Sequence, residues 1–161
     1  MKFLFLPLLF IAFIFNSCQN STVRRKPPVP KSDTDLITGC YYIVDDSTKL
    51  KREVVHSPYH EAYYINPKPI LTVANFKEVT ISDREGFSLF VELDGKGKTE
   101  WSMATEKYAG KKLAFIIDNE LVMAPTVMGK IDGGSFQVSG NFTKEEMETL
   151  FKKIHHEMYE D

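Results

Sequence analysis

Apolar and polar residues alternate along several short segments of this chain, and the alternation predicts β-strands. A strand between residues 87 and 93 places four apolar side chains on one face: Phe87, Leu89, Val91 and Leu93. Every residue of Leu113–Ile117 is apolar, so this strand is expected to be central and buried on both faces. Further strands are expected at residues 40–44, 62–65, 76–81, 120–124 and 135–139, and a polar loop at residues 45–58.

Turn-forming residues separate these segments. Asp118 and Asn119 tolerate positive φ better than most residues, which predicts a two-residue primed turn between antiparallel strands. Pro125 has no N–H to donate, so strand pairing is expected to end there. Gly133 and Gly134 then permit a turn into the strand at residues 135–139.

Two helices are predicted. Thr143 and Glu146 have the spacing of a capping box, and five apolar residues then mark one helical face: Met147, Leu150, Phe151, Ile154 and Met158. An earlier helix is expected after Asp94-Gly95, with Trp101, Ala104 and Tyr108 on one side and Gly110 at its end. The order of elements predicts an α+β fold, a mainly antiparallel sheet with two helices packed on one face.

The N-terminal segment has a different character. Residues 3–15 are almost entirely apolar, a run long enough for a signal peptide but short for a membrane span. Asn16-Ser17-Cys18 resembles the lipobox of bacterial lipoproteins, which implies a lipoprotein signal peptide at residues 1–17 and lipidation of Cys18. Plain secretion with an incidental Cys18 is the alternative. Attached acyl chains would anchor the protein at a membrane.

The polar, proline-rich residues 18–35 are expected to form a tether, which leaves residues 36–161 as the folded domain. At about 3.1 Å per residue, an extended tether would reach on the order of 50 Å. Arg24, Arg25 and Lys26 would contact anionic headgroups or simply be solvated. Lipidation of Cys18 would leave Cys40 as an unpaired thiol at the start of a strand, where a buried hydrophobe is favoured over a reactive group.

Charge and motifs exclude several classes of function. The formal net charge of −2 gives no general attraction to nucleic acid. Gly97-Lys98-Thr99 follows a strand as a phosphate loop would, but Glu92 stands where that motif needs glycine, so no nucleotide site is expected. His56 and His60 are separated by Pro58, which opposes a helical metal pair. We therefore expect no metal and no cofactor.

The sequence also contains no motif that supports catalysis. No GxSxG elbow is present. His155 and His156 are adjacent, so on a helix their side chains point in different directions, which opposes a metal site there. Acidic pairs such as Asp45-Asp46 are explained by solvation. An enzyme is the least favoured of three functional hypotheses.

From Tyr63 onward, about ninety residues resemble the head subdomain of the first periplasmic domain of SecD and SecDF, accessory subunits of the bacterial preprotein translocase. Three segments carry the resemblance: YYINPKPILTVANF, SLFVELDGKGKTEW and GKKLAFIIDNELVMAPTVMGKIDGGSFQVSGNFTKEE. Asn119 departs from the family pattern, which has glycine in this turn. SecD and SecDF also have membrane helices that use proton flow, whereas this chain has one apolar segment, so it is expected not to be a complete SecD.

The resemblance implies a non-enzymatic binding module, facing the periplasm, that contacts exported unfolded polypeptide or translocase subunits. Its candidate binding surface is Met123, Pro125, Met128 and Phe136, since exposed methionines suit adaptable contacts; packing of these side chains in the core is the alternative. The second hypothesis is an envelope lipoprotein that reuses the fold as a structural or interaction module without a role in translocation. Gln19 after Cys18 favours the outer membrane.

Overall fold

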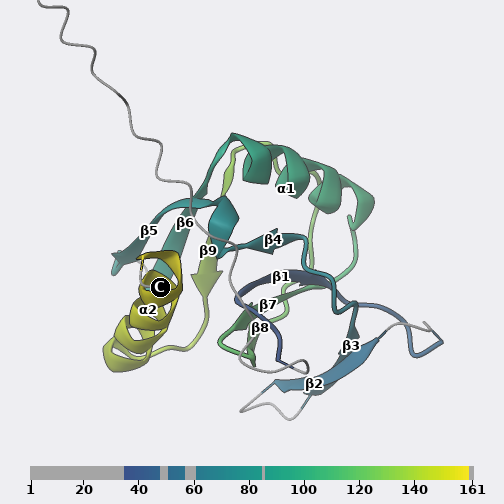
Figure 1. Ribbon diagram of the computed structural model, residues 1–161, viewed down its shortest axis with the longest axis horizontal. Helices are drawn as coiled ribbons and strands as arrows, with labels where there is room; N and C mark the ends of the chain where they lie inside the picture. The colour runs from purple at the N-terminus through teal and green to yellow at the C-terminus, as the bar shows by residue number, and fades with distance from the viewer. Residues whose placement is uncertain (1–34, 48–50, 57–60, 85, 160–161) are drawn as a thin grey trace, which may run out of the picture.

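The computed structural model describes residues 35–47, 51–56, 61–84 and 86–159. The signal peptide, Cys18 and the tether up to residue 34, which the sequence predicts, lie outside the described residues. The elements follow in this order (Figure 1): β1 (Gly39–Tyr42), β2 (Arg52–His56), β3 (Glu61–Ile65), β4 (Leu71–Thr72), a short 3-10 helix η1 (Val73–Asn75), β5 (Phe76–Ser82), β6 (Ser88–Leu93), α1 (Gly95–Lys107), β7 (Leu113–Ile117), β8 (Glu120–Met123), β9 (Ser135–Ser139) and α2 (Lys144–Tyr159).

The strands form three sheets. One has the order β4-β1-β7-β8, another has the order β5-β6-β9, and β2 and β3 form a hairpin. All of these strand pairs are antiparallel, which confirms the predicted α+β class. The hairpin is attached to the end of β1, because the Val44 N–H donates to the Tyr64 carbonyl at 2.8 Å. The division of the strands into three sheets is a feature that hydrophobic periodicity does not encode.

Strand β7 separates two hydrophobic clusters, and all five of its residues are buried. Leu113, Phe115 and Ile117 face the larger cluster, which includes residues of both helices and of the three-stranded sheet. Ala114 and Ile116 face the smaller cluster, which the β2–β3 hairpin covers. The predicted central strand is therefore confirmed, and both helices pack on the same side of the four-stranded sheet.

Strand β2 lies inside the predicted loop of residues 45–58, so that prediction is wrong. Arg52-Glu53 and His56 made the segment look polar, whereas Val54 packs against the smaller cluster. A two-stranded hairpin with one face towards the core needs few apolar residues, so the sequence pattern of its strands is hard to distinguish from that of a loop. The two-residue strand β4 and η1 were also not predicted.

The β7–β8 turn has the predicted conformation, with φ of 47° at Asp118 and 68° at Asn119. The prediction that pairing ends at Pro125 is wrong. Strand β8 ends at Met123, but the Leu113 N–H donates to the Pro125 carbonyl at 3.1 Å. The Val127 N–H then donates to the Lys111 carbonyl at 2.8 Å. Proline lacks a donor but keeps its acceptor, so the chain continues alongside β7 past this residue.

Both helix starts are capped by side chains. At α2, the Thr143 N–H donates to Glu146 Oε2 at 2.8 Å and the Glu146 N–H donates to Thr143 Oγ1 at 3.2 Å, which confirms the capping box. At α1, the Gly97 N–H donates to Asp94 Oδ1 at 2.6 Å. Neither of these helices, the two in the described part of the chain, is long and apolar enough to cross a membrane.

Candidate functional site: an apolar cavity beside β9

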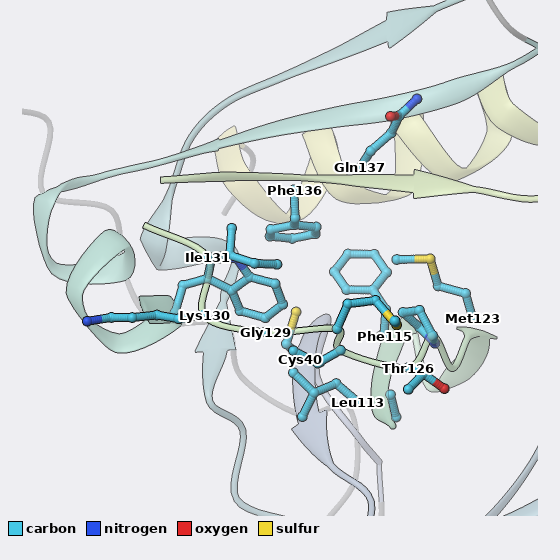
Figure 2. A pocket seen from close by; sticks show the side chains of 15 residues that line it. Cys40, Leu113, Phe115, Met123, Thr126, Gly129, Lys130, Ile131, Phe136 and Gln137 are labelled. Carbon is cyan, nitrogen blue, oxygen red and sulfur yellow. The ribbon is translucent and has the colours of Figure 1, made fainter. Parts of the chain in front are cut away.

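The four residues of the candidate binding surface line one cavity of about 590 Å³. The cavity lies between the four-stranded sheet and β9, beside α1 (Figure 2). Its walls come from five parts of the chain: Cys40 of β1, Trp101 of α1, residues 113–115 of β7, residues 123 and 125–131, and Phe136 and Gln137 of β9. The fold thus brings Met123, Pro125, Met128 and Phe136 together, although twelve residues lie between the first and the last.

The segment at residues 124–131, which we call the rim segment, is fixed on two sides. Its first half follows β7 through the backbone hydrogen bonds at Pro125 and Val127. Its far end is held by α1, because the Ile131 N–H donates to Thr105 Oγ1 at 2.9 Å. Between these anchors, Val127 is buried while the Met128 side chain is 91% exposed. A fully exposed methionine on a fixed segment is available to a partner without rearrangement of the backbone.

Aromatic rings form the wall opposite the rim segment. Figure 2 shows Phe136 pointing from β9 into the cavity towards Phe115. The Phe136 ring lies 5.4 Å from that of Phe115 and 5.2 Å from that of Trp101, between ring centroids. Phe136 is half-buried, so it takes part in core packing and also lines the cavity.

Trp101, one of the residues that line the cavity, carries a buried polar group. Its side chain is 6% exposed, and its Nε1–H has no acceptor among the described residues. A buried donor without an acceptor costs about 1–3 kcal/mol. The helical pattern placed Trp101 on a buried face, but only the three-dimensional structure shows that its donor lacks a partner.

The remaining walls carry little charge. Among the described residues that line the cavity, Lys130 alone is charged, and its Nζ lies 3.6 Å from Glu106 and 3.8 Å from Asp132 outside it. In Figure 2 the Lys130 side chain points away from the cavity. The Cys40 thiol is 3% exposed, and burial raises its pKa far above the ordinary value. Cys40 is therefore the buried hydrophobe that the sequence predicted, and the cavity suits uncharged, apolar groups.

Other candidate sites find little support. The Gly97 amide, which a phosphate loop would offer to a ligand, is used by the Asp94 carboxylate. In the described part of the chain, no group of three or more His, Cys, Asp and Glu residues is placed to hold a metal ion. His60 lies outside the described residues, so the His56–His60 pair stays untested.

A family model decides the relationship to known proteins. Residues 49–155, more than half of the chain, match the model of the SecDF P1 head subdomain. The chain belongs to this family. The resemblance seen in the sequence is confirmed, and all four candidate surface residues lie within the matched range.

Individual relatives agree. The protein translocase subunit SecD of Rickettsia felis is 28% identical over 126 residues, which covers 68% of this chain and 24% of SecD. SecD of Rickettsia prowazekii is 32% identical over 98 residues, which covers 58% of this chain and 19% of SecD. The chain thus spans about a quarter or less of these relatives.

A solved structure of SecDF, described as a membrane component that enhances protein export, is 16% identical to this chain with a TM-score of 0.56. The similarity covers 74% of this chain and 63% of that chain. At this level of identity the comparison concerns the fold, and it supports the α+β architecture.

Proposed function

We propose that this protein is a non-enzymatic, lipid-anchored binding module of the cell envelope that takes part in protein export. In this proposal, the apolar cavity beside β9 receives side chains of unfolded exported polypeptide. The single observation that carries the proposal is the cavity itself, an apolar site with an exposed methionine, in a chain of the SecDF P1 head family.

The chemistry of the cavity fits an unfolded chain. Apolar side chains of such a chain would enter between Phe136 and the rim segment, and Met123 and Met128 would adjust to different shapes. An unfolded polypeptide supplies apolar side chains in almost any sequence.

The strength of such binding would be modest. Full burial of one Leu or Phe side chain contributes about 1.5–3 kcal/mol, from which the cost of ordering the bound chain is subtracted. One cavity that takes one or two side chains would therefore bind weakly and release quickly. Weak, sequence-tolerant binding suits a module that holds a moving chain.

Lipidation of Cys18 would place this module at a membrane, facing the periplasm, with residues 18–35 as the tether. Gln19 favours the outer membrane. Metabolic labelling with a radioactive fatty acid tests this part: wild-type protein should carry label and Cys18→Ser should carry none. Label in both proteins, or in neither, would contradict the anchor.

Site-specific photo-crosslinking in living cells tests the role in export. The probe is placed at Met128, and a matched control probe at Phe90, which is 45% exposed and does not line the cavity. We expect crosslinks from position 128 to exported polypeptide or translocase subunits, and few from position 90. Crosslinks from position 128 only to unrelated envelope proteins would support the second candidate function, an envelope lipoprotein that reuses the fold.

A further inference from the structure

A second groove, of about 710 Å³, lies between β2, β8 and the first half of α2, away from the cavity beside β9. Five apolar side chains line it: Val54, Leu121, Val122, Phe142 and Leu150. Strand β8, which contributes to the lining, is the last strand of its sheet. The groove is therefore a site with apolar walls beside the edge strand of the four-stranded sheet.

Carboxylates predominate among the charged residues of this groove. Four carboxylates and only two cations line the groove: Glu53, Glu120, Glu145 and Glu146, with Arg52 and Lys153. Lys153 already contacts Glu120 at 3.3 Å and Asp118 at 3.5 Å. Within the described ranges, Glu53 and Glu145 have no ion-pair partner, so the groove favours an occupant with positive charges.

The N-terminal segment joins the domain at one end of this groove. Asn119, which lines the groove, accepts a hydrogen bond on Oδ1 from the Leu36 N–H at 3.0 Å and another from Arg52 at 3.1 Å. Its Nδ2 lies 3.5 Å from Asp35 Oδ1. Asp35 is therefore held beside the groove, so a segment that precedes it in the chain would have a high effective concentration for this site.

We propose that residues 24–34, RRKPPVPKSDT, bind in this groove of their own chain. The segment carries Arg24, Arg25, Lys26 and Lys31 against a single acidic residue, Asp33, so its charge complements that of the groove. Pro27, Pro28 and Pro30 have no N–H, so contact with apolar walls leaves no donor of theirs unpaired.

The length of the segment is also compatible with binding in this groove. Along α2, Lys153 and Glu145 are separated by about 12 Å at 1.5 Å per residue. Four extended residues span about 12 Å at 3.1 Å per residue, so Lys31 can reach Glu145 from the attachment at Asp35. The remaining basic residues then have enough chain to reach Glu53.

Binding of this segment would shorten the free tether. Only residues 18–23 would then link Cys18 to the domain, and release of the segment would extend the reach by on the order of 30 Å. The groove would thus control how far the module extends from its anchor. This inference does not depend on what the cavity beside β9 binds.

Limited proteolysis of the full-length protein in detergent tests the inference. Trypsin cleaves after Arg24 and Arg25, and binding in the groove should slow this cleavage. Reversing two groove charges with Glu53→Lys and Glu145→Lys should raise the cleavage rate about threefold to tenfold, as expected for the loss of two exposed charge pairs. High salt should raise the wild-type rate similarly.

The matched control carries Glu78→Lys and Glu148→Lys, with the same change in net charge; both residues lie outside the groove, Glu78 exposed on β5 and Glu148 partly exposed on α2. Its cleavage rate should equal that of the wild type. A carbodiimide should also join Lys26 or Lys31 to Glu53 or Glu145 within one chain. Equal rates in both double variants, or crosslinks only between chains, would overturn the proposal.

Discussion

The ring of Phe136 on β9 meets the ring of Phe115 on β7 edge to face, with centroids 5.4 Å apart. This contact joins the edge strand of the three-stranded sheet to the central strand of the four-stranded sheet. Phe136 also meets Phe76 edge to face at 6.0 Å. One residue of the candidate surface is therefore part of the core, whereas Met128 is almost fully exposed.

The two residues should respond differently to the same substitution. Phe136→Asp removes three ring contacts and puts a charge beside the core, so we expect a loss of about 3 kcal/mol in the free energy of unfolding. Met128→Asp changes an exposed side chain and should stay within about 0.5 kcal/mol of the wild type. Urea denaturation at pH 7 measures both. Equal losses in the two variants would contradict the structure, in which Phe136 packs against the core and Met128 is exposed.

Trp101 is the only tryptophan in the chain and lines the cavity, so its fluorescence reports on binding there. A short extended peptide with two Leu or Phe residues should change the Trp101 emission, with a Kd on the order of 0.1–1 mM. The same peptide with serine in place of the apolar residues is the control. Identical titrations for both peptides, or no change up to several millimolar, would contradict binding of apolar side chains in this cavity.

Gly39 is required where β1 passes β4. A Cβ at this position would lie 2.0 Å from the Leu71 carbonyl oxygen, which is backbone and cannot move aside. Gly39→Ala should therefore lower the free energy of unfolding by about 2–3 kcal/mol. Gly129 on the rim segment has no atom within 4 Å of its Cβ position, so Gly129→Ala is the matched control, with an expected change below about 1 kcal/mol. Similar losses in the two variants would contradict the close approach of β1 and β4.

Local sequence signals are sufficient to predict the structure where the residue type decides the backbone geometry. Asp118 and Asn119 formed the turn that their tolerance of positive φ predicts. Thr143 and Glu146 formed both hydrogen bonds of a capping box. The wholly apolar β7 was recognised as central because polar alternation is absent from it.

Other features depend on contacts that are distant in sequence. Whether Val54 marks a strand depends on the smaller cluster, to which β1 and β7 contribute half of the buried residues. Pairing beyond Pro125 depends on Lys111 and Leu113, which offer partners to the proline carbonyl and to Val127. Residue types alone predict the candidate surface. Its arrangement around a cavity, and the unpaired Trp101 N–H, follow only from how α1 and β9 pack.

The core contains two adjacent titratable groups on β1. Burial raises the pKa of the Cys40 thiol far above its ordinary value of 9.0. Burial also raises the pKa of Tyr41 above its ordinary value of 10.0, with a further contribution from Cys40. The Tyr41 hydroxyl donates to the Ile37 carbonyl at 2.6 Å, a contact that requires the proton. Both groups therefore stay protonated in the folded state at pH values where the unfolded chain loses its protons.

This difference predicts alkaline destabilisation with a defined origin. The stabilising contribution is complete well below pH 9.0 and declines above it, because the unfolded Cys40 ionises there while the folded thiol does not. Each such group lowers the free energy of unfolding by about 1.4 kcal/mol per pH unit, and Tyr41 adds its effect above pH 10.0. Cys40→Ser lacks the thiol, so its stability should fall less steeply between pH 9 and 10. Urea midpoints at constant ionic strength measure the slopes, and equal slopes in the two proteins would refute the assignment to Cys40.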